Sequence, residues 1–315
     1  MGVVDMQFVY KAIISSIVYL YLSCYKTIIV KKLYSFIFLV FLTTASFAAT
    51  VDTLVVRSAV MERSYKAAVV LPASYTKTKS AYPVLYLLHG AYGHFGDWLI
   101  KPTDKMLLHQ LADQYNIIIV TPEGGSFSFY LDSPENKASQ FETYITKDVI
   151  NAIDQTYRTV NKKEGRAITG LSMGGHGALY LSAKHPELFI AAGSMSGAVD
   201  MESMLKRDSS AHVKKLMEPV FGSQSGSPEL YAAHAVVNMV EAIGRNGIAL
   251  IIDCGVDDFL FEANRELHSR LIAARVPHDY TERPGAHTWE YWTNALPYQL
   301  LYFRNVFVKN GITVP

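Results

Sequence analysis

Residues 167–184 read AITGLSMGGHGALYLSAK, which is a short apolar run, a glycine-rich turn and a stretch of helical period. The turn Gly170-Leu171-Ser172-Met173-Gly174 matches the pattern G-x-S-x-G, and this is the only match in the chain. A strand, a sharp turn and a helix in this order form the context in which the pattern exposes a nucleophilic serine above a sheet. Glycines flank the serine because side chains there would collide with the strained turn. The stretch therefore predicts an α/β fold with Ser172 as nucleophile.

On both sides of this stretch, short β-branched runs alternate with helical patterns such as 141–157 and 262–274. This alternation is typical of a mostly parallel central sheet flanked by helices. The segment 197–247 lacks a strand signal, and we expect a small cap-like excursion or a variable loop with short helices. The expected strands, of which the first two form an antiparallel pair, are 51–56, 65–71, 83–88, 117–120, 167–171, 190–194, 249–253 and 278–282.

A second glycine-containing turn, HGAYG at residues 89–93, directly follows the expected strand 83–88. In hydrolases with a G-x-S-x-G turn, a loop at this place gives one backbone N–H to the substrate oxygen, and the residue after the nucleophile gives another. Ala91 and Met173 are the predicted donors of this oxyanion hole. We expect His89 to bond loop carbonyls rather than to react.

The acid and the base are expected after Ser172 in the order acid, then histidine. Of the ten histidines, only His287 follows the acid loop in a glycine-containing turn at a strand end. A base on such a loop can reach across to the nucleophile. Asp257 and Asp258 both follow a buried run, and Asp258 is the predicted acid because it stands three residues after Gly255.

Aromatic residues near these turns suit an acyl or aromatic substrate pocket, although such residues are more often plain core. Trp98, Tyr130 and Trp289 are the predicted substrate-binding residues. The sequence has no H-E-x-x-H motif, no Cys/His cluster at ligand spacing and no G-x-G-x-x-G loop, so we expect neither a metal nor a cofactor. Cys254 ends an apolar run and is expected to be a buried, unreactive thiol.

The first 48 residues differ in composition from the rest of the chain. Lys31 and Lys32 precede an apolar run, and small residues at Ser46 and Ala48 suit cleavage after Ala48. Residues 30–48 are therefore predicted to be a signal peptide, and residues 1–29 a mis-annotated extension. A membrane anchor is the alternative, but lysines interrupt the apolar runs. We expect residues 49–315 to form one exported domain, periplasmic or extracellular, without a stable membrane anchor.

Composition excludes other classes of protein. The chain has 50% hydrophobic and 18% charged residues, which suits a globular protein rather than a disordered one. Its 29 basic and 28 acidic residues form no basic stripe, so a nucleic-acid partner is not expected. The sequence does not indicate an oligomeric state.

Together, these motifs resemble the esterase D and feruloyl-esterase-like group of α/β hydrolases, which includes tributyrin esterases, S-formylglutathione hydrolases and antigen 85-like mycolyltransferases. The resemblance runs from residue 53 to the C-terminus. It implies an α/β-hydrolase fold, with Ser172, Asp258 and His287 as catalytic triad and Ala91 and Met173 as oxyanion donors. The stretches that carry it are 70–72, 86–90, 170–177, 253–255 with Asp258, and 285–289 with Tyr291 and Trp292.

The resemblance implies a serine carboxylesterase that acts through an acyl-enzyme. We expect short-chain acyl or hydroxycinnamoyl esters as substrates, either small molecules or esters linked to glycans. Hydrolysis of S-formylglutathione is disfavoured, because glutathione chemistry is cytosolic and the predicted signal peptide implies export. If the protein is a different kind of enzyme, the alternative reaction is acyl transfer to a sugar. If it is not an enzyme, the alternative is a non-catalytic binding protein on the same scaffold.

Overall fold

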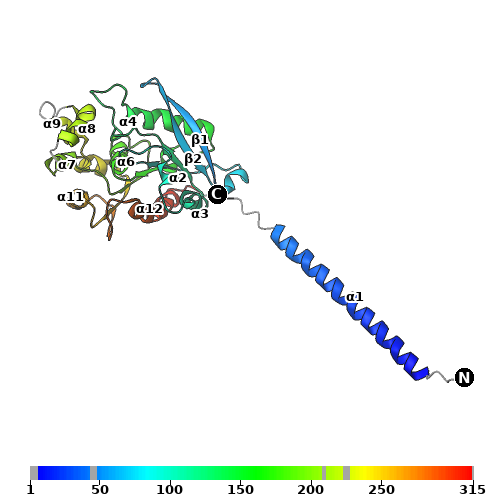
Figure 1. Cartoon of the computed structure of the whole chain (residues 1–315). Coiled ribbons are helices and arrows are strands. Elements are labelled where there is room, and N and C mark those ends of the chain that lie inside the picture. Colours follow the sequence, from blue (N-terminus) through cyan, green and yellow to red (C-terminus); the bar gives the residue numbers. More distant parts are fainter. Residues whose placement is uncertain (1–5, 43–47, 208–210, 223–227, 314–315) are drawn as a thin grey trace. The chain divides into compact units, whose positions relative to one another are not determined.

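The structure is a computed structural model that describes residues 6–42, 48–207, 211–222 and 228–313 of the chain. The chain divides into two compact units, Met1–Phe47 and Ala48–Pro315. The described residues of the first unit form the helix α1 (Met6–Leu42), drawn in blue in Figure 1. By length and composition its stretch Ile14–Lys32 can cross a membrane, a property that signal sequences share. Ser46, at the predicted cleavage region, lies outside the described residues.

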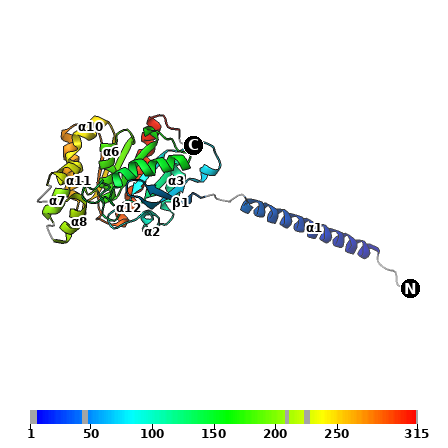
Figure 2. The ribbon, with the colours of Figure 1, turned by 90° about the horizontal axis from the view of Figure 1, so that it is seen from above.

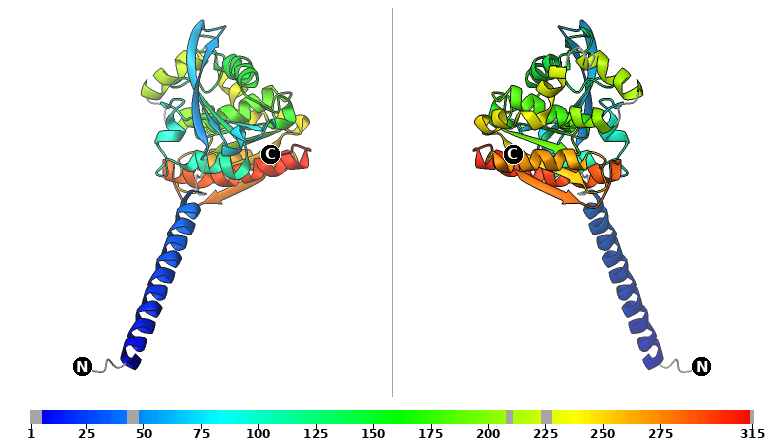
Figure 3. Two further views of the ribbon diagram at one scale, coloured as in Figure 1. Left: turned by 90° about the vertical axis from the view of Figure 1, so that its right-hand side faces the viewer. Right: turned by 90° about the vertical axis from the view of Figure 1, so that its left-hand side faces the viewer.

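The described part of the second unit contains an eight-stranded sheet with the order β1-β2-β4-β3-β5-β6-β7-β8. β1 and β2 form an antiparallel hairpin, in blue in Figure 3, and β2 also pairs antiparallel with β4. The remaining pairs are parallel, which confirms the predicted mostly parallel sheet. The strands are β1 (Thr50–Ser58), β2 (Arg63–Leu71), β3 (Val84–Leu88), β4 (Ile118–Pro122), β5 (Arg166–Gly170), β6 (Ala191–Met195), β7 (Ala249–Gly255) and β8 (Asp279–Arg283).

The central strands β3 to β7 are buried on both faces, and each face of the sheet has its own hydrophobic core. In β3, the side chains of Val84, Tyr86 and Leu88 enter one core, and those of Leu85 and Leu87 enter the other. This two-sided burial explains why the strands read as continuous apolar runs. The first core is covered by α5 (Ile150–Thr156), α6 (Met173–Lys184) and α11 (Phe261–Ala273), and the second by α3 (Leu107–Tyr115) and α12 (Trp289–Lys309).

The predicted helix 141–157 is a continuous helical stretch with a π-helical centre, made of α4 (Phe141–Thr143), the turn Tyr144–Val149 and α5. The described residues of the excursion 197–247 form mainly short helices, of which α7, α8 and α9 lie close together in Figure 1 and α7 and α8 are neighbours again in Figure 2. Its last helix returns the chain to β7. The helices of the excursion are α7 (Met201–Arg207), α8 (Ala211–Phe221), α9 (Pro228–His234), the 3-10 turn Val236–Asn238 and α10 (Val240–Asn246).

Candidate active site

Ser172 occupies a strained turn between β5 and α6. Its backbone has φ 55° and ψ −118°, a conformation that non-glycine residues rarely adopt. A Cβ at Gly170 would lie 2.6 Å from the backbone of Gly174. A Cβ at Gly174 would lie 2.6 Å from the carbonyl oxygen of His89 and 2.7 Å from that of Leu88. The two glycines therefore allow the turn to pack against the end of β3.

The structure brings Ser172, His287 and Asp258 into one chain of hydrogen bonds. His287 Nε2 lies 2.8 Å from Ser172 Oγ. On the other side of the ring, His287 Nδ1 lies 2.8 Å from Asp258 Oδ2 and 3.0 Å from Oδ1. Asp258 follows β7 and His287 follows β8, so two neighbouring strands deliver both groups to the edge of the sheet where Ser172 follows β5. This is the arrangement of a nucleophile, a general base and an orienting acid.

Asp258 is held as a buried carboxylate. Burial by itself opposes ionisation, but hydrogen bonds from His287 and from the backbone N–H of Leu260 stabilise the charge and hold the pKa of Asp258 below its usual value. The Leu260 bond measures 2.8 Å to Oδ1. Asp258 is therefore ionised at neutral pH and favours the tautomer of His287 that carries its proton on Nδ1.

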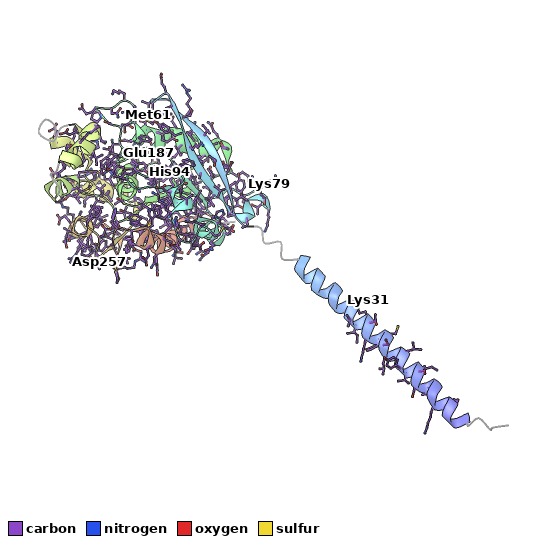
Figure 4. The ribbon with its side chains drawn as sticks, viewed as in Figure 1. Lys31, Met61, Lys79, His94, Glu187 and Asp257 are labelled. Carbon is purple, nitrogen blue, oxygen red and sulfur yellow. The ribbon has the colours of Figure 1, made fainter. Side chains whose placement is uncertain are left out.

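The neighbouring carboxylate has a different environment. Asp257 is exposed at the edge of the folded unit (Figure 4). Its backbone N–H donates to the carbonyl oxygen of Gly285 at 2.9 Å, which ties the acid loop to the loop of His287. Gly285 has φ 138°, a backbone conformation that favours glycine. Asp257 thus contributes its backbone to the contact between the two loops.

Two aromatic rings enclose the imidazole of His287. The ring of Phe259 lies 4.5 Å from it between centroids, at an interplanar angle of 48°. The ring of Trp292 lies 4.8 Å away and nearly perpendicular, at 89°. Aromatic contacts of this geometry are attractive, so they restrict the ring to the orientation in which Nε2 faces Ser172.

The predicted oxyanion donors lie beside the nucleophile. Ala91 and Met173 line the same cavity as Ser172, and within the described residues neither backbone N–H donates to a protein acceptor. The loop before Ala91 passes close to the nucleophile, since a Cβ on Gly90 would lie 3.5 Å from Ser172 Cβ. The two N–H groups are therefore available to an oxygen of the substrate.

His89 supports this loop from beneath. It is buried, its Nδ1–H donates to the carbonyl oxygen of Gly90 at 2.8 Å, and its Nε2 accepts from the N–H of Gly124 at 2.9 Å. Burial lowers the pKa of His89, which favours the neutral ring that this pair of bonds requires. The residue holds the loop in place, as expected from the sequence.

A cavity of about 330 Å³ opens at Ser172. Its volume is in the range typical of small-molecule sites. Most of its wall is aromatic or aliphatic. Among the described residues that line it, the acidic and basic side chains other than His287 are Asp97 and Lys101. The apolar side chains of the wall include Phe127, Phe129, Met204, Phe259, Trp289 and Trp292.

Two of the three predicted substrate-binding aromatics do not line the cavity. Trp98 is 1% exposed, and its Nε1–H donates to the carbonyl oxygen of Leu88 at 3.1 Å. Tyr130 is fully buried, and its hydroxyl donates to the carbonyl oxygen of His89 at 3.0 Å. Both predictions are corrected, because Trp98 Nε1–H and the Tyr130 hydroxyl each donate to a backbone carbonyl oxygen behind the oxyanion loop, and neither ring lines the cavity. Trp289 lines the cavity and stacks edge-on against Trp98.

Sequence reasoning missed several residues of the cavity. Asp97 is the first residue of the short helix α2 (Asp97–Ile100), and Lys101 directly follows this helix. Both residues come soon after the oxyanion loop in the sequence. Phe127 comes from a loop after β4, and Phe259 stands next to Asp258. The only available signal was proximity in sequence to a predicted catalytic residue, which does not specify the direction of a side chain.

A larger cavity of about 530 Å³ lies elsewhere, among residues such as Ile190, Ile248 and Asp279. These residues mark the amino ends of β6, β7 and β8, whereas ligands in α/β sheets bind at the carboxyl ends. Among the described residues, no group of three or more metal-binding side chains is placed to hold an ion. Cys254 is buried, and burial raises the pKa of its thiol, so it is a poor nucleophile.

Comparison with known proteins identifies the relatives of this chain. Residues 58–303 match a family of proteins described as "Putative esterase". An acetyl esterase of Caldicellulosiruptor saccharolyticus is 31% identical over 219 residues, which cover 67% of this chain and 79% of that protein. An esterase of Mycobacterium tuberculosis is 30% identical over 247 residues, and this chain spans 52% of its length.

A solved structure agrees with these relatives. The structure of a ferulic acid esterase superposes with a TM-score of 0.70 at 29% sequence identity, and it covers 83% of this chain and 100% of that one. These relatives fall within the group that the sequence motifs resemble.

Because Gly174 packs closely against the backbone at the end of β3, adding a single methyl group there should strongly reduce stability. Gly174→Ala should lower the free energy of unfolding by about 1–3 kcal/mol, because the new methyl group meets two backbone oxygens that cannot move aside. Gly96→Ala is the matched control, since its Cβ would meet only the ring of exposed His94, at 3.1 Å. Urea denaturation measures both variants, and equal stabilities would contradict the steric argument.

Proposed function

This chain belongs to the Esterase family and is a serine carboxylesterase, and we propose that Ser172, His287 and Asp258 are its catalytic triad. The observation that carries the proposal is the unbroken chain of hydrogen bonds from Ser172 Oγ through the imidazole of His287 to Asp258. The strained backbone of Ser172 supports it, and so do the N–H groups of Ala91 and Met173, which donate to no acceptor in the described part of the chain.

In the proposed mechanism, His287 Nε2 accepts the hydroxyl proton of Ser172 while Oγ attacks the ester carbonyl carbon. The carbonyl oxygen becomes negatively charged and accepts hydrogen bonds from the N–H groups of Ala91 and Met173. The imidazolium then gives its proton to the leaving alkoxide, and an acyl-enzyme remains. A water molecule, deprotonated by His287, attacks the acyl carbon, and proton return to Ser172 Oγ releases the free acid. Asp258 stabilises the imidazolium in both halves.

We propose short-chain acyl or hydroxycinnamoyl esters, in small molecules or on glycans, as the substrates. The aromatic walls at Phe127, Phe129 and Trp289 suit a planar acyl group, and the volume of about 330 Å³ also admits smaller ones. The acetyl esterase and the ferulic acid esterase among the relatives support the same two acyl classes. No cofactor takes part in the proposed steps, which use only groups of the chain.

We also propose that residues 30–48 are a signal peptide and that residues 49–315 form the mature enzyme outside the cytoplasm. Lys31 and Lys32, followed by the apolar run 33–42, support export. The stretch Ile14–Lys32 of α1, which is long and apolar enough to cross a membrane, lies mostly before this segment. N-terminal sequencing of the enzyme purified from the periplasm or medium should begin at Ala49. A chain that retains residues 1–48 in the membrane fraction would instead identify α1 as an anchor.

Removal of the nucleophile should abolish turnover. Ser172→Ala is expected to lower kcat by about a million-fold for p-nitrophenyl esters and methyl ferulate, with an unchanged melting temperature. Ser182→Ala is the control, because Ser182 lies in α6, the helix that Ser172 precedes, and among the described residues its hydroxyl bonds only the carbonyl oxygen of Leu179. Product analysis with an added sugar should find free acid rather than acylated sugar. Activity of Ser172→Ala within about tenfold of the wild type would exclude Ser172 as nucleophile.

Substitution of Asp258 should lower kcat far more than substitution of the adjacent Asp257. Asp258→Asn keeps the shape of the side chain but permits the wrong tautomer of His287, and a loss of about ten-thousand-fold in kcat is expected. Asp257→Asn should cost less than about tenfold, because the exposed side chain of Asp257 does not contact His287 and its backbone bond to Gly285 is retained. Steady-state kinetics of both variants tests the assignment, which the reverse order of effects would refute.

A further inference from the structure

We infer that Lys101 makes the rim of the Ser172 cavity a recognition site for a carboxylate group of the ester substrate. The inference rests on the proposed function, since it assumes that this cavity receives the ester. Among the described residues that line the cavity, Lys101 is the only lysine or arginine. Apart from Asp97, the rest of the wall is mainly aromatic and aliphatic, so the ammonium group of Lys101 is the feature of the described wall that can favour an anionic substrate over a neutral one.

The ammonium group of Lys101 is held in one place by two contacts. Its Nζ donates to Asp97 Oδ2 at 2.7 Å, and it lies 5.6 Å from the ring centroid of Trp289, which is a cation–π distance. Trp289 is in turn packed edge-on against buried Trp98, with 5.1 Å between ring centroids. A positioned lysine loses less rotamer entropy when it binds a ligand than a free one does.

The contact with Asp97 leaves Lys101 able to bind a second anion. An ammonium group has three N–H donors, and the carboxylate of Asp97 uses one of them. Asp97 itself is 2% exposed, and its other carboxylate oxygen, Oδ1, lies 3.1 Å from His94 Nε2, so Lys101 is not the only group that faces this carboxylate. The side chain of Lys101 is 40% exposed, which gives a substrate access to its remaining donors.

A carboxylate is the ligand class that fits this arrangement. It accepts hydrogen bonds from an ammonium group, and its charge is complementary to Lys101. In an ester substrate the carboxylate has two possible sources. It is carried either by the far end of the acyl chain, as in the half-ester of a dicarboxylic acid, or by the alcohol, as in a uronic acid.

Matched pairs of substrates test the inference and separate the two sources. For the acyl side, p-nitrophenyl hydrogen adipate is compared with its methyl ester, and for the alcohol side, 4-acetoxybenzoate is compared with its methyl ester. The measured quantity is the ratio of kcat/KM for the anionic ester to kcat/KM for the neutral one. In Lys101→Gln this ratio should fall about fivefold in at least one pair, the size expected for a partly exposed ion pair. The pair in which it falls identifies the source.

Three controls keep the result specific. Glutamine at position 101 can still donate a hydrogen bond to Asp97, and a melting temperature measures any loss of folding. Lys101→Arg keeps the charge and should retain the ratio, and Lys162→Gln removes an exposed lysine that does not line the cavity. In the wild type, the preference for the anionic ester should weaken as salt is raised, because salt screens exposed charges.

The inference is overturned if the ratio in Lys101→Gln stays within about twofold of the wild-type ratio for both pairs. It is also overturned if Lys162→Gln lowers the ratio as much as Lys101→Gln, since the effect would then come from the overall charge. Either result leaves the proposed function intact, provided that Ser172→Ala abolishes hydrolysis of all four esters. Hydrolysis that survives in Ser172→Ala would refute the proposed function itself.

Discussion

The positive φ of Ser172 is the constraint on which the site depends. A serine held in this conformation raises its hydroxyl above the carboxyl edge of the sheet, but only if the backbone on both sides can approach other backbone atoms. Gly170 and Gly174 permit that approach to the end of β3. Because β3 and β5 are parallel neighbours, the loop after β3 then lies beside Ser172, and its residues Gly90, Ala91 and Tyr92 line the same cavity.

A second buried carboxylate fixes the loop of His287. Asp253, 2% exposed near the end of β7, accepts hydrogen bonds from the side chains of Arg283, at the end of β8, and Tyr291, in the first turn of α12. Burial raises the pKa of Asp253, although the contacts with Tyr291 and Arg283 oppose the shift. The loop that carries His287 joins β8 to α12, so this cluster anchors both of its ends. Removing one partner would leave an unpaired buried group, which is costly.

Much of the fold and of the geometry of the candidate site could be predicted because both depend on local patterns. Apolar runs bounded by glycine marked the strands, and chain order with glycine spacing selected Ser172, Asp258 and His287, which the structure brings into contact. The walls of the cavity could not be predicted in this way. An aromatic residue fits a core as well as a pocket, and tertiary packing buried the polar atoms of Trp98 and Tyr130 behind the oxyanion loop.

The hydrogen-bonded site residues could be predicted and the cavity walls could not because the two come from different parts of the fold. This origin bears on substrate choice. The hydrogen-bonded groups come from the ends of sheet strands, whose positions follow from backbone pairing, whereas the cavity walls come from separate connecting segments. Met204 belongs to the excursion before β7, Phe127 to the loop after β4, and Lys101 to the segment after β3. Each segment can change without disturbing the sheet. A relative at 31% identity therefore shares the reaction more readily than the substrate, and the acid and alcohol of the natural ester must be inferred from the side chains of these segments.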